Sequence, residues 1–274
     1  MNKRRRSLFL LGGMVAAILM GIHLTRSDES CKGTPRTYEE IMQSGVIRAT
    51  TEYNSIGYHV KDDTIAGFHY ELFQAFADAK HLKADIVPEM ELGVQIAGVD
   101  HGTYDVIAGS LLITSEQKDS VLLFSQPIVR NRQILIQRKP KSETDSLYIR
   151  SQLELGGKTV FIPKDSPAQF RIHNLGMEIA DTIHIKEFPQ YGSEQLLALV
   201  AHGDIDYAIC EESIARKLID RYPQLDINTA VSFNQFYGWG TSKESQELTD
   251  TINAWLDRYM QTKAFDNLLK KYFK

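Results

Sequence analysis

The stretch GSLLITSEQKDSVLLFSQP, residues 109–127, contains the end of an apolar run that we expect to be buried, followed by a polar segment. The chain is largely apolar over Val106–Ile113, turns polar over 114–120, and then becomes apolar again. A short apolar run bounded by polar residues is typical of a buried strand. Residues 114–120, which include Gln117 and Lys118, are therefore predicted to form a turn at the end of a strand.

Strand-like and helical patterns alternate along the first half of the chain. Apolar residues at helical spacing run from Phe68 to Ala77, and strand-length apolar runs precede and follow them. Those runs are VIRATT (46–51), ADIV (84–87) and DVIAG (105–109). This alternation predicts an α/β domain with mainly parallel strands.

A second series begins after the strand-like run RQILIQRK (132–139). It contains a helix for which Ser193 is the expected N-cap. Two α/β units joined by ordered strands are therefore predicted, and a long apolar-faced helix containing Trp255 and Leu256 follows them. The strand-like runs of this half are KTVFI (158–162), IHIKEF (183–188) and DYAIC (206–210), and the stretch FYGWGTS (236–242) lies near the end of the chain.

The first residues differ from the rest in composition. Lys3 and Arg4–Arg6 precede residues 7–24, which hold no acid or base apart from His23. A run of this length crosses about 30 Å of hydrocarbon as a helix, and its basic flank is expected to stay in the cytoplasm. Residues 1–26 are predicted to be a signal anchor, with a cleaved signal peptide as the alternative. The remaining chain is predicted to be periplasmic or extracytoplasmic, anchored to the inner membrane by residues 7–24.

The predicted exported part is acidic. Residues 1–26 hold five Lys or Arg and no acid, so the remainder has 26 basic and 35 acidic residues and a formal charge of −9. Such a chain is not expected to bind nucleic acid. Cys31 and Cys210 lie in unlike contexts, and a buried free thiol is expected at Cys210 rather than a bridge.

Six motifs occur in order along the exported part. They are GFHYELFQAFA (67–77), HGTYDVIAGSLLIT (101–114), VLLFSQP (121–127), LGGKTVFIPKDSPA (155–168), HGDIDYAICE (202–211) and LLKKYF (268–273). Together they resemble the extracytoplasmic solute-binding proteins of family 3, the polar amino acid type of ABC transporters. The resemblance implies an α/β, two-lobed periplasmic-binding-protein fold of type II, with a hinge of two crossing strands. Lobe 1 would comprise 38–131 and 232–274, and lobe 2 would comprise 132–231.

The resemblance also implies a function. A small polar solute would be held in the interlobe cleft and delivered to an ABC permease in the inner membrane, without an enzymatic step. Clefts of this kind lie outside strand ends, where backbone amides and helix starts can hold a charged small molecule.

The resemblance implies which residues contact the ligand. Family members pair the ligand carboxylate with an Arg and its ammonium with an acid, and the matching residues here are Gln117 and Glu211. Gln117 lacks the charged fork of Arg, so Lys118 is an alternative partner for a carboxylate. This departure favours an amide or a peptide-like amine over a free α-amino acid. The expected ligand-binding residues are Tyr53, Tyr58, Gly109, Ser110, Gln117, Lys118, Ser166 and Glu211.

Several of these residues have a structural alternative. Gln117 and Lys118 also suit a solvated turn. Glu211 and Glu212 also suit the first turn of the helix EESIARKL, where acids complement the helix dipole. The two tyrosines, Tyr53 and Tyr58, also suit packing within a loop.

No metal or cofactor is predicted, because the eight His residues show no paired metal spacing and no phosphate-loop pattern occurs. Two alternative functions stay open. The fold also resembles cyclohexadienyl dehydratases, in which a cleft carboxyl donates a proton, and Glu211 or Glu71 would be that donor. The chain is also similar to the N-terminal regulatory half of membrane-bound lytic transglycosylases, which favours a stand-alone ligand sensor.

Overall fold

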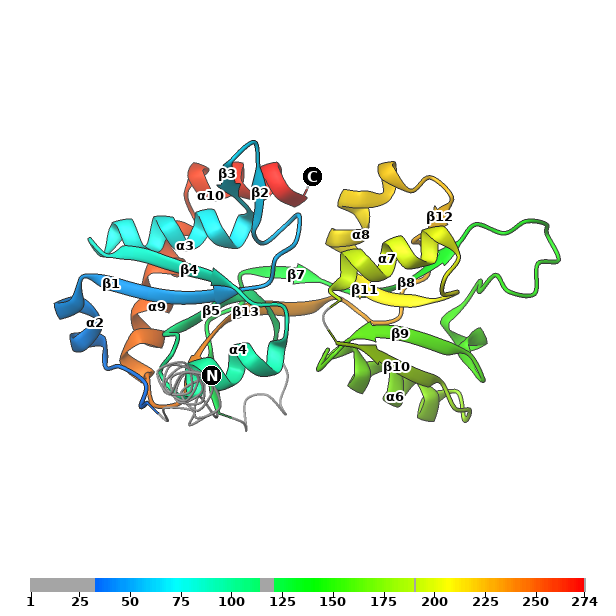
Figure 1. The fold of residues 1–274 in the computed structure, drawn as a ribbon, viewed down its shortest axis with the longest axis horizontal. Coiled ribbons are helices and arrows are strands. Elements are labelled where there is room, and N and C mark those ends of the chain that lie inside the picture. Colours follow the sequence, from blue (N-terminus) through cyan, green and yellow to red (C-terminus); the bar gives the residue numbers. More distant parts are fainter. Residues whose placement is uncertain (1–32, 114–120, 190, 274) are drawn as a thin grey trace, which may run out of the picture. The chain divides into compact units, whose positions relative to one another are not determined.

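The computed structural model describes residues 33–113, 121–189 and 191–273. Its strands form a six-stranded sheet, a five-stranded sheet and a two-stranded hairpin (Figure 1). The strands are β1 (Val46–Thr51), β2 (His59–Lys61), β3 (Thr64–Ala66), β4 (Lys83–Pro88), β5 (Val106–Leu112), β6 (Leu122–Phe124), β7 (Val129–Asn131), β8 (Gln133–Arg138), β9 (Thr159–Pro163), β10 (His184–Phe188), β11 (Ala208–Glu211), β12 (Leu225–Asp226) and β13 (Gln235–Ser242).

Helices flank both larger sheets (Figure 1). The α-helices are α2 (Tyr38–Ser44), α3 (Phe68–Ala79), α4 (Leu92–Asp100), α6 (Ala168–Glu178), α7 (Ser193–His202), α8 (Glu212–Leu218), α9 (Gln246–Tyr259) and α10 (Lys263–Phe273), and the 3₁₀ helices are η1 (Gln152–Leu155) and η2 (Ile219–Arg221). We call the six-stranded sheet with the β2–β3 hairpin, α2, α3, α4, α9 and α10 lobe 1, and the five-stranded sheet with α6, α7, α8, η1 and η2 lobe 2.

The strand order is β4-β1-β5-β13-β6 in lobe 1, where β7 also pairs with β13, and β10-β9-β11-β8-β12 in lobe 2. Strand β1 runs parallel to β4 and β5, and β9 runs parallel to β10 and β11. Strand β13 is antiparallel to its neighbours, and so is β8. The expectation of mainly parallel strands is therefore only partly right, because the strands that cross between the lobes enter each sheet in the opposite direction.

Two chain segments connect the lobes. Strand β7 ends at Asn131 and β8 begins at Gln133, so the chain changes sheets across a single residue. The returning segment pairs with it on both sides, since Ala230 bridges Ile134 and Gln235 pairs with Asn131. These are the two crossing strands of the expected hinge. The lobe boundaries at 38, 131, 231 and 274 stay a prediction.

Aromatic side chains fill the space between α3, β13 and α9. Phe73 meets Trp239 at a centroid distance of 5.6 Å, and Phe76 meets Trp255 at 5.4 Å, both edge to face. Leu256 is fully buried in the same core. The long helix near the carboxyl end of the chain therefore packs on lobe 1, as expected. In lobe 2, Cys210 is a buried free thiol, also as expected.

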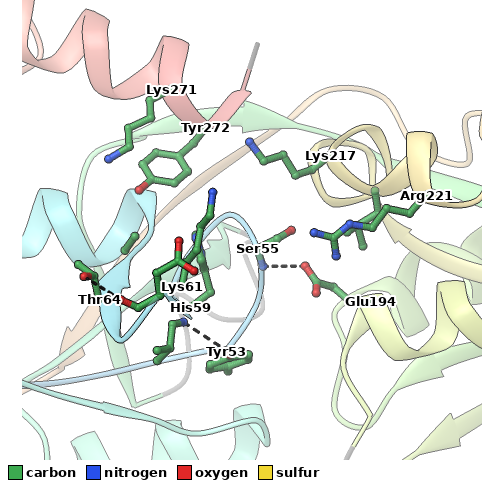
Figure 2. A pocket seen from close by; sticks show the side chains of 14 residues that line it. Tyr53, Ser55, His59, Lys61, Thr64, Glu194, Lys217, Arg221, Lys271 and Tyr272 are labelled. Atoms are coloured by element: carbon green, nitrogen blue, oxygen red, sulfur yellow. Dashed lines mark hydrogen bonds between the residues drawn. The ribbon is translucent and has the colours of Figure 1, made fainter.

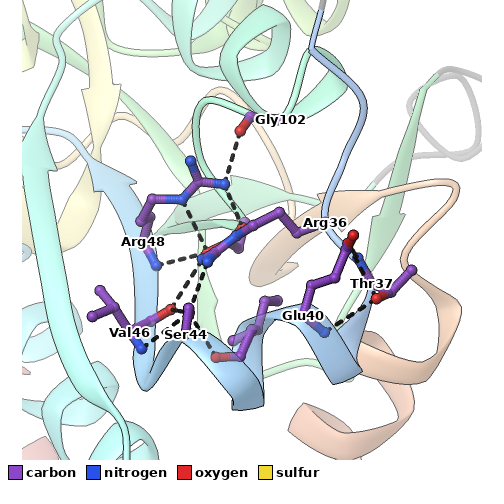
Figure 3. A network of polar contacts seen from close by, with 9 residues as sticks. Arg36, Thr37, Glu40, Ser44, Val46, Arg48 and Gly102 are labelled. Carbon is purple, nitrogen blue, oxygen red and sulfur yellow. Dashed lines mark hydrogen bonds and ion pairs between the residues drawn. The ribbon is translucent and has the colours of Figure 1, made fainter.

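A buried carboxylate secures the start of β5 (Figure 3). The Asp105 side chain is 1% exposed and forms ion pairs with Arg36 and with Arg48, the latter at 3.0 Å. The backbone amide of Arg48 also donates to Asp105 Oδ2 at 2.8 Å, and the Arg48 guanidinium donates to the Gly102 carbonyl at 2.8 Å. Because every charge in this network has a partner, it holds β1, β5 and the segment before α2 together.

Ser193 is the first residue of α7 rather than its N-cap. Gly192 occupies the cap, and its amide donates to the Gln195 side chain at 3.1 Å. Among the described residues, no helix is long and apolar enough to cross a membrane, and no cluster of His, Cys, Asp and Glu is placed to hold a metal ion. The predicted span at 7–24 lies outside the described residues.

Candidate functional site

The strand order of each lobe points to one edge of its sheet. In lobe 1, β1 lies between β4 and β5, and in lobe 2, β9 lies between β10 and β11. At such positions the chain connections diverge, and ligands bind outside the carboxyl ends of the strands. Glu52 follows β1 and Ser166 follows β9, while Ser110 lies near the end of β5 and Glu211 ends β11.

These strand ends line one cavity of about 90 Å³, which we call the inner cleft. Four of the expected site residues line it: Gly109, Ser110, Ser166 and Glu211. The volume is far below the roughly 300–1,000 Å³ of typical ligand sites, so a ligand of amino-acid size needs the lobes to separate further. The lobes touch at this point, because Lys164 of lobe 2 pairs with Glu91 of lobe 1 at 2.7 Å.

Two carboxyl groups from different lobes share the inner cleft. Burial, followed by the nearby charge of Glu52, raises the pKa of Glu211 to about 8, although Asn131 donates to its Oε2 at 3.0 Å. Burial, followed by the charge of Glu194, raises the pKa of Glu52 to about 7. Within residues 33–113, 121–189 and 191–273, neither Glu52 nor Glu211 forms an ion pair. The cleft therefore holds two carboxyl groups that ionise only near or above neutral pH, because no cation of the described protein pairs with them.

The start of α7 adds a third acid and brings the lobes close together. Glu194 Oε1 accepts the backbone amide of Ser55 at 2.6 Å, which links lobe 2 to the loop after β1. A Cβ at Gly192 would lie 2.8 Å from Glu52 Oε1, so a glycine leaves the room that this approach needs. The amino end of α7 carries a partial positive charge, which partly offsets the charge of Glu52.

Ser110 has a defined hydrogen-bond role. Trp239 Nε1 donates to His69 Nδ1 at 3.2 Å, which makes His69 Nε2 the protonated nitrogen of a neutral ring. Burial lowers the pKa of His69 to about 3, so the ring stays neutral. His69 Nε2 then donates to Ser110 Oγ at 2.9 Å, and the Ser110 hydroxyl hydrogen is left for another acceptor. Ser110 lines the inner cleft, so that acceptor can belong to a ligand.

The other expected residues lie elsewhere. Tyr53 is 41% exposed and lines a second, larger cavity. Tyr58 is buried in its loop, edge to face with Tyr70 at 5.7 Å, and lines neither of these two cavities in the described chain. Gln117 and Lys118 fall outside the described residues.

The two remaining acids considered from the sequence are paired. Glu212 Oε2 accepts Arg132 Nε at 2.7 Å and Glu212 Oε1 accepts Arg216 at 2.6 Å, and these hydrogen bonds lower the pKa of Glu212 despite partial burial. Burial alone would raise the pKa of Glu71, but hydrogen bonds from Lys271 and Tyr272 bring it below its usual value. An ionised Glu71 outside the inner cleft does not fit the role of cleft proton donor.

Sequence reasoning missed Glu52 and Gln133, which both line the inner cleft. Glu52 follows β1 directly, so its place at a carboxyl strand end was the available signal. Gln133 is buried and donates to Tyr237 Oη at 3.0 Å. Its position at the hinge gave no comparable signal.

Comparison with known proteins agrees with the geometry. The model of the bacterial extracellular solute-binding proteins, family 3, matches residues 46–274. A curated relative, the membrane-bound lytic murein transglycosylase F of Aeromonas salmonicida (strain A449), is 28% identical over 249 residues, which cover 86% of this chain and 46% of the relative. The chain thus spans about half the length of the curated relatives it matches.

Two solved structures show the same fold. A P235GK mutant of the arginine-binding protein ArgBP from T. maritima superposes with a TM-score of 0.73 at 24% identity, covering 86% of this chain and 98% of that one. The ancestral amino-acid-binding protein AncCDT-1, a precursor of cyclohexadienyl dehydratase, gives a TM-score of 0.70 at 21% identity, with coverage of 86% and 99%. At these identities the likeness concerns the fold alone.

Proposed function

The chain belongs to the bacterial extracellular solute-binding proteins, family 3, and from this premise we propose that it binds a small cationic solute in the inner cleft without transforming it. One observation carries the proposal: Glu52 and Glu211 approach from opposite lobes, and neither has an ion-pair partner among the described residues. Burial and the charge of Glu52 raise the pKa of Glu211, burial and the charge of Glu194 raise the pKa of Glu52, and a bound cation relieves this repulsion. The cleft is therefore complementary to an ammonium or guanidinium group.

The position of the cationic group follows from the two lobes. Glu211 belongs to lobe 2 and Glu52 to lobe 1, so a cation between them contacts both and stabilises the closed arrangement. A neutral ligand would leave one or both acids to take up a proton instead. The Ser110 hydroxyl supplies a donor for an acceptor atom of the same ligand.

The sequence refines the ligand class. Because Gln117 stands where the family Arg would meet an α-carboxylate, we propose that the ligand carries an amide or another neutral acceptor there. L-Argininamide and L-arginine differ at this group, and agmatine lacks it altogether. These three compounds therefore test the two ends of the ligand separately.

The test uses the full-length chain in detergent. Thermal shift and calorimetry should show argininamide binding more tightly than arginine, and no binding of L-glutamate. A ligand at about a hundred times its Kd should stabilise the protein by roughly 2.7 kcal/mol. Binding of glutamate as tight as that of argininamide would refute the cationic preference.

Two substitutions examine the carboxylate side. Gln117→Arg should weaken argininamide binding and improve binding of arginine, because it restores a charged fork. Lys118→Ala should change little. If instead the wild type prefers arginine and Lys118→Ala abolishes binding, Lys118 has the role of the family Arg, and the amide proposal is wrong.

We further propose that residues 7–24 anchor the chain to the inner membrane and that the cleft delivers its solute to an ABC permease. The basic cluster before an uncharged run supports the anchor. Membrane fractions should hold the full-length chain, extractable by detergent and not by salt. Recovery of a soluble form beginning near Asp28 would instead indicate a cleaved signal.

One observation favours an enzyme as the second candidate. A carboxyl with a pKa of about 8 is protonated at neutral pH and can serve as a general acid. The substrates of cyclohexadienyl dehydratases are less favoured by the cleft, since prephenate is a dicarboxylate and the ionised forms of Glu52 and Glu211 would repel it. Incubation with prephenate or arogenate, followed by product analysis, separates turnover from simple saturation.

A further inference from the structure

A second cavity, which we call the outer cavity, has a volume of about 790 Å³. Its walls come from the β2–β3 hairpin and α10 of lobe 1, and from α7, α8 and η2 of lobe 2 (Figure 2). A volume of this size accommodates a small organic molecule. Glu194 lines this cavity, whereas Glu52 and Glu211 line the inner cleft.

Positive charge predominates in the outer cavity. Lys61, Lys217, Arg221 and Lys271 line it, together with the acids Asp62 and Glu194. Lys271 pairs with Glu71 at 2.7 Å, and Glu194 accepts the Ser55 amide. In the described part of the chain, Lys61, Lys217 and Arg221 form no ion pair.

Two of these cations approach the same ring from different lobes. Lys217 Nζ lies 6.0 Å from the centroid of Tyr272, and Lys271 Nζ lies 5.1 Å from it. Figure 2 shows Lys217 and Lys271 extending toward Tyr272 from separate helices. Glu71 pairs with Lys271, whereas Lys217 has no ion-pair partner in the described chain, so an anion beside Tyr272 would relieve the repulsion between Lys217 and its cationic neighbours.

One polar atom in the lining also lacks a partner. Ser55 Oγ is buried and makes no hydrogen bond among the described residues, and Ser55 lines the outer cavity. Buried polar atoms in folded proteins nearly always have a partner, so Ser55 Oγ indicates a group that completes the site. A hydroxyl can donate directly to an oxyanion.

We propose that the outer cavity is a second binding site, for a small oxyanion with two or more negative charges, held between Lys61 and Lys271 of lobe 1 and Lys217 and Arg221 of lobe 2. Phosphate and polycarboxylates share this chemistry. The site goes beyond the proposed function, because its ligand is opposite in charge to the cation of the inner cleft. An anion that contacts both lobes and a cation that contacts both lobes depend on the same separation of the lobes, so each changes the affinity of the other by the same factor.

Calorimetry on the full-length chain in detergent tests the site with two probes, inorganic phosphate and citrate, against sodium chloride at equal ionic strength. We expect saturable binding of at least one probe. The variant Lys217→Gln/Arg221→Gln should raise the Kd of that probe about tenfold or more. The matched control Lys263→Gln/Lys270→Gln removes the same charge from exposed positions of α10 that do not line the cavity, and should leave the Kd within twofold.

The coupling is measured with argininamide. Saturating anion should change the Kd of argininamide about threefold or more in the wild type, and not in Lys217→Gln/Arg221→Gln. Glu211→Gln should keep anion binding while losing the cation, so failure of the inner-cleft proposal is distinguishable from failure of this one. Preference for phosphate or for citrate identifies the source of the oxyanion. The proposal is overturned if neither probe saturates, or if the control variant weakens binding as much as the cavity variant.

Discussion

Carboxyl groups lie at both ends of the neighbouring strands β1 and β5, and they differ in whether a cation pairs with them. Near the amino end of β5, Asp105 is buried and paired with Arg36 and Arg48. Beyond the carboxyl end of β1, Glu52 has no ion-pair partner in the described chain, and its neighbour across the cleft is another acid, Glu211. Asp105 has ion-pair partners within the protein, whereas Glu52 and Glu211 have none in the described chain.

The difference separates stability from binding. A buried acid that already has its cations contributes to the fold, and removal leaves those cations unpaired. Buried acids without cations weaken the empty protein and retain their attraction for a ligand. The comparison predicts that substitution of Asp105 changes the free energy of unfolding. Substitution of Glu52 or Glu211 should instead change the affinity for a ligand.

The largest expected effect is that of Asp105 on stability. Asp105→Ala should lower the free energy of unfolding by roughly 3–5 kcal/mol, because it leaves two guanidinium groups and an amide without their acceptor. Denaturant titration of the full-length chain measures this. Asp257→Ala, at an exposed position of α9, is the control and should stay within about 0.5 kcal/mol. Argininamide affinity of the folded Asp105→Ala protein should be almost unchanged, and a large loss would break the separation.

The next largest effect is that of Glu211 on ligand affinity. Glu211→Gln should weaken argininamide binding by roughly 2–5 kcal/mol, because it removes a desolvated charge opposite the cation. Calorimetry measures the change. Glu212→Gln is the matched control, since Glu212 is the next residue but already pairs with Arg132 and Arg216. Equal losses in both variants would mean that general negative charge, and not the position of Glu211, binds the cation.

Much of the fold could be predicted because short apolar runs in the sequence mark its strands. The runs around Val46–Thr51, Gln133–Arg138 and Ala208–Glu211 are short, apolar and buried, and each forms a strand close to its expected limits. The β2–β3 hairpin was missed because its side chains are largely exposed. Its turn does carry a signal, since Asp62 and Asp63 both adopt the positive φ of a type I′ turn, and Asp tolerates that conformation.

The inner cleft could be predicted only in part. Ser110, Ser166 and Glu211 were each suggested by one motif at a strand end. Glu52 was missed because its significance arises from a second acid, Glu211, that is distant in sequence and belongs to the other lobe. Periodicity reports which face of a strand is buried, and it does not report which strand ends meet across a cleft.

The pH dependence should differ in sign between the empty and the bound protein. The folded pKa values of Glu52 and Glu211, about 7 and about 8, lie above the value of 4.5 for an exposed Glu, so the folded state holds protons that the unfolded state has released. The stability contribution of these groups is full below about pH 4.5 and is lost as pH rises toward 8. Cation binding needs the ionised forms, so Kd should fall over the range from pH 6 to 8.5.

Thermal melts and calorimetry across that range measure both trends. Each carboxyl should contribute up to about tenfold in Kd per pH unit below its folded pKa. The double variant Glu52→Gln/Glu211→Gln should lose the slope of melting temperature against pH between 5 and 8, while Glu212→Gln should keep it. A wild-type protein whose Kd rises with pH would contradict the assignment.

The smallest expected effect concerns Ser110, and it tests a neutral contact of the inner cleft. Because Trp239 donates to His69 Nδ1, His69 Nε2 donates to Ser110, and the remaining Ser110 hydrogen is available to a ligand acceptor. Ser110→Ala should therefore weaken argininamide by about 1 kcal/mol, roughly fivefold. Agmatine has no carbonyl at that end, so its Kd should not change. An equal loss for both compounds would show that Ser110 positions the neighbouring backbone, and that the hydroxyl makes no contact with the ligand.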